Sequence, residues 1–206
     1  MTALAHTLGR RQTTRSALLT DVLLIVLGSL VVAGLAQISV RLPFTPVPVT
    51  GQTLGVLLVG ASLGATRGGA SLLLYLGEGA AGLPVFAEGR SGLDYLTLAD
   101  PLHATGGYLW GFVVAAFVVG FLAQRGWDRS IGSALGAMFV GEIVIFACGL
   151  PWLAAALDVS GERALTFGLY PFVLGECLKL AIAAGALPGA WKLFGGGPGL
   201  TGVPRS

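Results

Sequence analysis

Long stretches without a charged side chain limit the fold of this chain more than any other feature of its sequence. Residues 22–39 and 105–124 contain no Asp, Glu, Lys or Arg. Each stretch is close to the ~20 apolar residues with which an α-helix crosses a bilayer. The whole chain agrees, because only twelve Lys or Arg and ten Asp or Glu occur among 206 residues, of which 54% are hydrophobic. These figures exclude an ordinary soluble enzyme, a disordered protein and a disulfide-rich secreted module, and we predict a polytopic membrane protein.

Six apolar segments fit membrane-spanning helices and leave no room for a soluble domain. They are residues 21–39, 52–65, 69–83, 105–124, 130–157 and 167–191. The second and third are short and are separated only by residues 66–68, and we expect an interruption of the fifth near residues 149–151. The first is too long for a signal-peptide core and has no cleavage site, so we expect it to be retained. The predicted fold class is an all-α membrane protein, a compact bundle of six transmembrane helices.

The positions of the basic residues predict how this bundle is oriented. With the N-terminus inside, eight of the twelve basic residues fall in cytoplasmic segments, three in outer loops, and Lys179 within a span. Cytoplasmic loops carry the excess of Lys and Arg, so we predict that both termini are cytoplasmic. The chain then divides into a cytoplasmic segment 1–20, a membrane domain 21–191 and a cytoplasmic Gly/Pro tail 192–206. We expect a multi-pass protein of the bacterial cell membrane.

Two connecting segments are expected on the outer side. Residues 41–51 cannot form a helix, because Pro43, Pro46 and Pro48 each remove a backbone donor and restrict the preceding residue. A long mixed loop follows the third span and runs to about residue 104.

Small residues recur at helical spacing in two spans. Gly60, Gly64 and Gly68 fall on one stripe of the second, and Ser29 and Ala33 follow Gly28 in the first. Such stripes let helix backbones approach closely in lipid. For the second span we favour packing within the bundle. For the first, docking of Ser29 and Ala33 onto another membrane protein is an alternative to internal packing.

Ionisable side chains inside a span mark candidate functional sites, because a charge in lipid is costly. Four qualify: Glu78, Glu142, Glu176 and Lys179. Glu176 and Lys179 are three residues apart, so both project from one face of the last helix. They form either a self-contained ion pair or, as we prefer, a polar ligand site. Glu142 lines the same cavity or pairs with Lys179, and Glu78 either contributes or reaches the membrane interface.

Two aromatic residues are placed to complete a ligand pocket. Tyr108 follows two glycines at the outer end of the fourth span, and Phe86 lies in the preceding loop, so both are candidates for the wall of a pocket.

The sequence contains no GxxxxGK[ST], HExxH or GxSxG motif, and its only lysines are Lys179 and Lys192. We therefore predict neither an ATPase nor another enzyme, no metal or cofactor, and no nucleic-acid partner.

Four motifs in a fixed order resemble one family. LPFTPVPVTGQ (42–52), GLPVF (82–86), TGGYLWGF (105–112) and Glu176-x-x-Lys179 are similar to the BioY family, the biotin-specific substrate-binding (S) component of energy-coupling-factor transporters. The resemblance extends over nearly the whole chain. It implies a six-helix fold with an outward biotin pocket, capped by the loop between the first two spans. It also implies a transmembrane coupling protein and two ABC-type ATPases as partners.

The resemblance also implies which residues bind the ligand. The family usually has Asp where this chain has Glu176, and a polar residue near the Ala87–Gly89 stretch touches the ligand in some members, which makes Glu88 a candidate. The predicted substrate-binding residues are Glu176, Lys179, Tyr108, Phe86, Glu88, Gln52 and Thr45. Ser29 and Ala33 are the predicted docking residues for the coupling protein.

The chemistry of biotin fits such a site. Its ureido ring offers two N–H donors and one carbonyl acceptor to a carboxylate and an ammonium, and its other parts need apolar walls. Three alternatives stay open: an S component for another vitamin, a stand-alone carrier coupled to protons through Glu142 or Glu176, and an intramembrane enzyme that uses a carboxylate dyad on a lipid.

Overall fold

The structure, a computed structural model, describes residues 14–98 and 104–194. This part of the chain is mostly helical, as the apolar runs predict, with a pair of two-residue strands and two short 3₁₀ helices. The helices are α2 (Thr14–Ala36), α3 (Gln52–Leu63), α4 (Ala65–Ala80), α5 (Gly106–Gln124), α6 (Ile131–Leu157), α7 (Gly161–Gly168) and α8 (Val173–Phe194). The predicted segment 1–20 lies mostly, and the tail 192–206 largely, outside the described residues.

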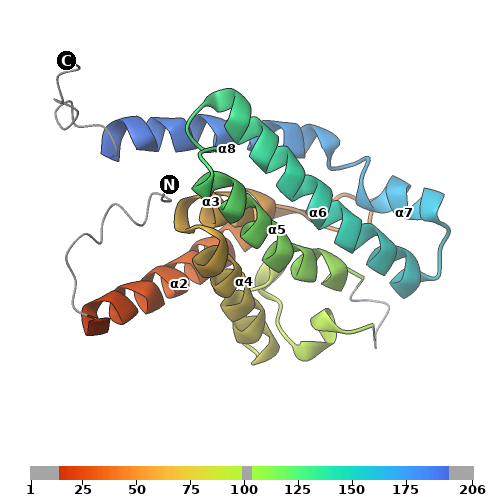
Figure 1. Cartoon of the computed structure of the whole chain (residues 1–206). Helices are drawn as coiled ribbons and strands as arrows, with labels where there is room; N and C mark the ends of the chain where they lie inside the picture. The colour runs from red at the N-terminus through yellow and green to blue at the C-terminus, as the bar shows by residue number, and fades with distance from the viewer. Residues whose placement is uncertain (1–13, 99–103, 195–206) are drawn as a thin grey trace, which may run out of the picture.

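Helix α5 lies at the centre of the bundle and packs against α3, α4 and α6 (Figure 1). Helix α2 covers α4 and α3, and α8 covers α6 and α3. Glycines make the close contacts possible: a Cβ atom on Gly120 of α5 would lie 2.4 Å from the carbonyl carbon of Gly64, and one on Gly60 would lie 2.6 Å from the Ala116 oxygen. The packing interpretation of the glycine stripe in the second span is therefore confirmed.

Three of the described helices are long and apolar enough to cross a membrane, namely α2 from Ala17 onward, α5 and α6. Helices α7 and α8 meet at an angle of 55° and form a fourth candidate if the pair counts as one span. Helix α3 is apolar but has only 12 residues. The six segments found in the sequence correspond to α2, α3, α4, α5, α6 and α8, whereas α7 is an additional helix.

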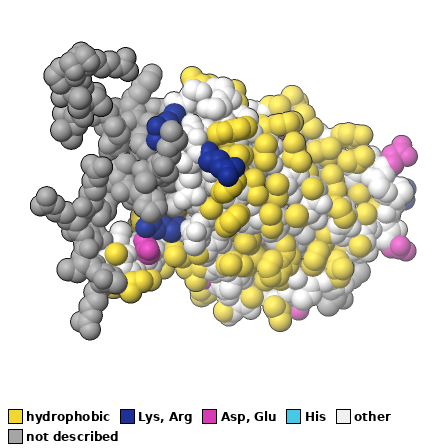
Figure 2. Space-filling model, in the orientation of Figure 1, with side chains coloured by type: hydrophobic (Ala, Val, Ile, Leu, Met, Phe, Trp, Pro, Cys, Tyr) yellow, Lys and Arg dark blue, Asp and Glu magenta, His cyan; other side chains and the backbone are white. Residues whose placement is uncertain are grey.

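The surface of the bundle is apolar over a broad belt. In Figure 2, hydrophobic side chains cover the middle of the face shown, Lys and Arg side chains lie toward its left, and acidic side chains project at its right end. Exposed large side chains of this belt include Leu19, Leu23, Leu27 and Leu30 on α2, Phe117 and Phe121 on α5, Phe139 and Ile143 on α6, and Leu174, Leu178 and Ile182 on α8. So large an exposed apolar surface suits lipid and not water.

The break between α3 and α4 lies at Gly64 and not, as predicted, at residues 66–68. Gly64 has φ 84° and ψ 175°, a conformation open almost only to glycine. Arg67, which the prediction placed in the loop, lies in the first turn of α4 and forms an ion pair with Asp21 at 2.5 Å. The arginine was taken as a sign of a loop, but its charge is neutralised by α2.

The last two predicted spans also differ from the structure. Helix α6 continues through Pro151 without the predicted interruption, since the freed carbonyl of a membrane helix can find other partners. The last long helix begins at Val173 instead of residue 167, because the preceding residues form α7. The Ser160 hydroxyl caps the N-terminus of α7 by accepting a hydrogen bond from the Arg163 amide at 3.4 Å.

The proline-rich segment is not helical, as predicted. Strand β1 (Ser39–Val40) pairs with β2 (Val49–Thr50) in antiparallel register, so the intervening residues form a loop that returns to the bundle. The Thr45 hydroxyl fixes this loop by donating to the Phe167 carbonyl at 2.6 Å. The mixed loop after α4 contains the 3₁₀ helices η1 (Ala87–Gly89) and η2 (Leu93–Leu96).

The predicted docking residues face the inside of the protein. Ser29 is fully buried and donates a hydrogen bond to Glu78 of α4, and Ala33 is 9% exposed. This hydrogen bond also gives Glu78 a structural role, because its carboxylate joins α4 to α2. The prediction that Ser29 and Ala33 dock onto the coupling protein is therefore wrong, and the alternative of internal packing holds, because Ser29 lies in the contact between α2 and α4.

Candidate functional site

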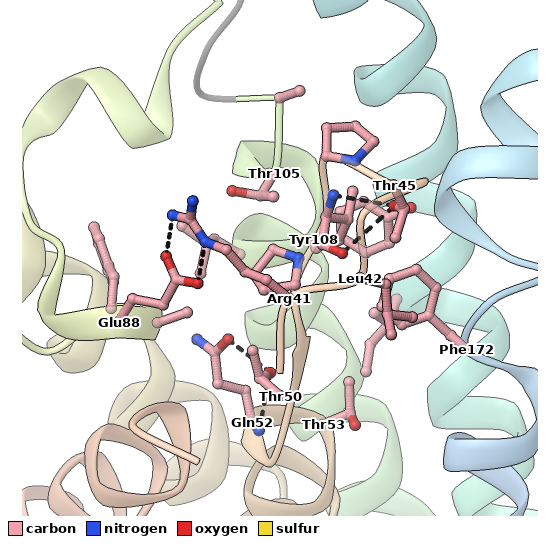
Figure 3. A pocket seen from close by; sticks show the side chains of 18 of the residues that line it. Arg41, Leu42, Thr45, Thr50, Gln52, Thr53, Glu88, Thr105, Tyr108 and Phe172 are labelled. Carbon is pink, nitrogen blue, oxygen red and sulfur yellow. Dashed lines mark hydrogen bonds and ion pairs between the residues drawn. The ribbon is translucent and has the colours of Figure 1, made fainter. Parts of the chain in front are cut away.

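One cavity of about 790 Å³ opens at the end of the bundle where β1 and β2 lie (Figure 3). It is enclosed by the proline-rich loop, by the loop after α4, by the adjoining ends of α3, α5 and α8, and by the middle of α6. All seven predicted substrate-binding residues lie in its wall: Thr45, Gln52, Phe86, Glu88, Tyr108, Glu176 and Lys179. The structure thus brings together residues from four separate parts of the sequence.

A compact polar group forms the buried part of the wall. Lys179 Nζ lies 2.7 Å from Glu176 Oε1 and donates to the Thr53 hydroxyl at 2.9 Å. The Thr53 hydroxyl in turn donates to Glu176 Oε2 at 2.8 Å. The ion pair is nearly removed from solvent, with side chains 13% and 8% exposed for Lys179 and Glu176. Both charges remain next to the cavity, so a ligand finds acceptors and donors side by side.

Glu142 lies behind this group and is not among the described residues that line the cavity. It is 4% exposed, neither carboxylate oxygen has a hydrogen-bond partner within the described part of the chain, and it interacts electrostatically with Glu176 and Lys179. Of the two alternatives for Glu142, the structure supports its interaction with Lys179 and does not place it among the described residues of the cavity wall. Helix α6 thus brings this side chain close to Glu176 and Lys179 of α8.

Gln52 lines the cavity, but its amide is already engaged by the protein. Its oxygen accepts from the Thr50 hydroxyl at 2.9 Å, and its nitrogen donates to the Tyr75 hydroxyl at 2.7 Å. Tyr75 then donates to the Val85 carbonyl at 3.1 Å. This chain of hydrogen bonds joins β2, α4 and the following loop, so Gln52 fixes the wall of the cavity.

Aromatic rings form much of the apolar wall. Phe86 is 2% exposed and packs edge-on against Tyr75, with ring centroids 5.5 Å apart. Tyr108 donates to the Gly168 carbonyl at 3.0 Å and packs edge-on against Phe146. Leu109, Phe112, Ile145 and Phe172 extend the same wall.

The two glycines before Tyr108 allow the neighbouring helix α6 to come close to α5. A Cβ atom on Gly107 would lie 2.2 Å from the Trp152 Cβ, and one on Gly106 would lie 2.8 Å from its ring. The pair makes room for Trp152 of α6 and not for a ligand. Tyr108 is placed at the cavity because α5 and α6 pack this closely.

The mouth of the cavity carries a second charged group. Both carboxylate oxygens of Glu88 accept from Arg41, and one lies 3.0 Å from Arg90 Nη2. Figure 3 shows Arg41 reaching from the proline-rich loop toward Glu88. The hydrogen bond to Glu88 raises the pKa of Arg41 above its ordinary value.

Sequence reasoning missed several residues that line the cavity, above all Thr53, Arg41 and Arg90. Arg41 and Arg90 were treated only as indicators of topology, although they are basic residues in two loops that meet at the cavity. Thr53 directly follows the last residue of the LPFTPVPVTGQ motif and lies one position beyond Gln52. Only the pairing of α3 with α8 reveals that it touches both Glu176 and Lys179.

Comparisons with known proteins agree with this architecture. A model of the BioY family matches residues 7–196. The chain is 35% identical over 172 residues to a biotin transporter BioY of Rhizobium etli, which covers 80% of this chain and 89% of that protein. It is 37% identical over 157 residues to a biotin transporter BioY of Thermotoga maritima, which covers 76% of this chain and 86% of that protein.

A solved structure shares the fold. The S-component for biotin from an ECF-type ABC transporter superposes with a TM-score of 0.75, over 88% of this chain and 95% of that chain, at 22% sequence identity. The fold similarity, the family match over most of the length and the ordered motifs agree with one another. The chain therefore belongs to the BioY family.

Proposed function

We propose that this chain captures biotin at the outer face of the cell membrane and is the substrate-binding S component of an energy-coupling-factor transporter. The observation that carries the proposal is the cavity, in which a carboxylate, an ammonium and a hydroxyl lie beside aromatic walls at one end of an apolar bundle. Such a cavity can form hydrogen bonds with a small polar ring and bury an apolar ring and chain, as the chemistry of biotin requires.

In the proposed arrangement, residues 21–191 form the membrane domain, with six helices in the bilayer and both termini cytoplasmic. The placement of the arginines supports it. Arg67 and Arg125 lie at the end of the bundle opposite the cavity, where α4 begins and α5 ends. Arg129 lies at the same end, in the connection from α5 to α6. The outer end carries Glu88, Asp94, Asp158 and Glu162 beside its three arginines.

A transmembrane coupling protein and two ABC-type ATPases would supply energy as separate chains. The relatives are named as transporters, and this sequence has no P-loop motif of its own. Lipid is the other partner, in contact with the apolar belt. We propose no catalytic step and no cofactor, and biotin leaves the site unchanged.

Substitution of the buried ion pair tests the proposal. Glu176→Gln and Lys179→Ala are each expected to weaken biotin binding by at least about tenfold, because each leaves a buried partner unpaired. Isothermal titration of the detergent-purified protein with biotin measures the effect. Glu176→Asp is the matched control, since it keeps the charge, and it should bind within about tenfold of wild type. Wild-type affinity in both Glu176→Gln and Lys179→Ala would show that the ligand does not use this pair.

A further inference from the structure

The charges in the cavity wall are unequally distributed between its buried part and its mouth. The buried pair, Glu176 and Lys179, is balanced. At the mouth, two guanidinium groups share the single carboxylate of Glu88. The described wall therefore carries three basic and two acidic side chains, and the one uncompensated positive charge lies at the mouth.

Exposure separates the two groups as well. The side chains of Arg41 and Arg90 are 65% and 40% exposed, far more than those of the buried pair. Aromatic and aliphatic side chains, among them Leu42, Phe86 and Phe172, belong to the same wall. A ligand that fits has a neutral polar head, an apolar middle and an anionic end, and the anionic end would meet the arginines.

The backbone around Glu88 is built to present its carboxylate to them. The Phe86 amide donates to the Arg90 carbonyl at 2.9 Å, which closes a tight turn with Glu88 near its tip. Glu88 itself has φ 62° and ψ 29°, a left-handed conformation that residues other than glycine, asparagine and aspartate rarely adopt. Arg90 is also held by the Tyr95 hydroxyl at 3.3 Å. Glu88 thus occupies the guanidinium edge of Arg41 in a bidentate geometry, the one that another carboxylate would use.

We propose that Arg41 and Arg90 form a carboxylate-recognition site at the mouth, and that Glu88 is a built-in competitor that occupies Arg41 until the carboxylate of the ligand replaces it. This inference rests on the proposed function, because it assigns the carboxylate of biotin to the mouth and its ureido ring to Glu176 and Lys179. It changes the expected role of Glu88 from a ligand contact to a group that the ligand displaces. The two roles predict effects of opposite sign.

The test compares biotin with biotinamide, in which a neutral amide replaces the carboxylate. Titrations of the purified full-length protein should show biotinamide binding about tenfold more weakly than biotin in wild type. Arg41→Gln should weaken biotin about tenfold and leave biotinamide within about twofold. Glu88→Gln should strengthen biotin about threefold and leave biotinamide within about twofold, because it removes the competitor. The preference for biotin should fall with added salt, since the mouth is exposed.

Arg163→Gln is the matched control. Arg163 is an exposed arginine of α7 at the same end of the bundle but does not line the cavity, so its loss should change both affinities by less than about twofold. Equal affinity of wild type for biotin and biotinamide would overturn the inference without any substitution. A loss of biotin affinity in Glu88→Gln would overturn the competitor role. Wild-type protein that binds neither ligand would instead contradict the proposed function, which keeps the two failures apart.

Discussion

Among single residues, Thr53 is the one whose hydroxyl holds the buried site together. It accepts from Lys179 and donates to Glu176, so one hydroxyl satisfies two charged groups that would otherwise lack a partner on that side. Thr53 is 9% exposed, and the side chains of Glu176 and Lys179 are 8% and 13% exposed. In such surroundings an unpaired polar atom costs about 1–3 kcal/mol.

Removal of this hydroxyl should therefore be felt by the ligand. Thr53→Val keeps the shape of the side chain but deletes its donor and acceptor, and we expect biotin affinity to fall about tenfold. Thr53→Ser restores the hydroxyl and is the control, with affinity close to wild type. Titration of the purified variants measures both. If Thr53→Val binds biotin as tightly as Thr53→Ser, the hydroxyl does not organise the site.

At the same scale, the sequence identified the charged residues of the site better than their surroundings. Glu176 and Lys179 were found because charges within apolar runs are rare. Glu142 satisfied the same criterion, yet it lies behind the site, because residues 34 positions apart in sequence can be placed only once α6 and α8 pack together. Thr53 escaped notice because a threonine in an apolar run carries no such signal.

At the scale of elements, the last turn of α4 sets the position of the aromatic wall. Gly79 faces Phe86 so closely that a Cβ atom would lie 2.1 Å from the Phe86 ring. Gly79 also accepts from the Gly92 amide at 2.8 Å, which holds the loop after α4 against the helix. The absence of a side chain at Gly79 thus allows the loop, with Phe86, Glu88 and Arg90, to close over the cavity.

Gly79→Ala should move Phe86 out of the wall and weaken biotin binding severalfold, with a loss of stability of about 1–3 kcal/mol from overpacking. Gly77→Ala provides the control on the same helix, because a Cβ atom there meets nothing within 4 Å. Thermal unfolding and biotin titration of both variants check the result. Unchanged binding in Gly79→Ala would mean that Phe86 does not shape the ligand site.

The apolar runs predicted the existence of the long helices but not all of their ends. Helix α5 begins at Gly106 and ends at Gln124, within one residue of the predicted segment. The break at Gly64 and the passage of α6 through Pro151 depend on tertiary contacts that local preferences do not contain. Helix α7 was missed because its eight residues include the charges of Glu162 and Arg163, which favoured a loop.

For the whole molecule, the fold separates two tasks by position. The apolar belt suits contact with lipid, and the cavity at one end suits a small ligand. Ser29 and Ala33 are internal, so tryptophan at either position would disturb the packing of α2 on α4 and would not report on a partner. A partner in the membrane would meet the exposed side of α2 or another part of the belt.

The central claim concerns the ligand, and the binding selectivity of the purified full-length chain tests it most directly. Equilibrium binding should be measured by titration with biotin, desthiobiotin, thiamine and riboflavin under one set of conditions. We predict that biotin binds tightly and that neither thiamine nor riboflavin competes with it, because the cavity combines one buried ion pair with apolar walls. Binding of thiamine or riboflavin in a protein that does not bind biotin would contradict the account.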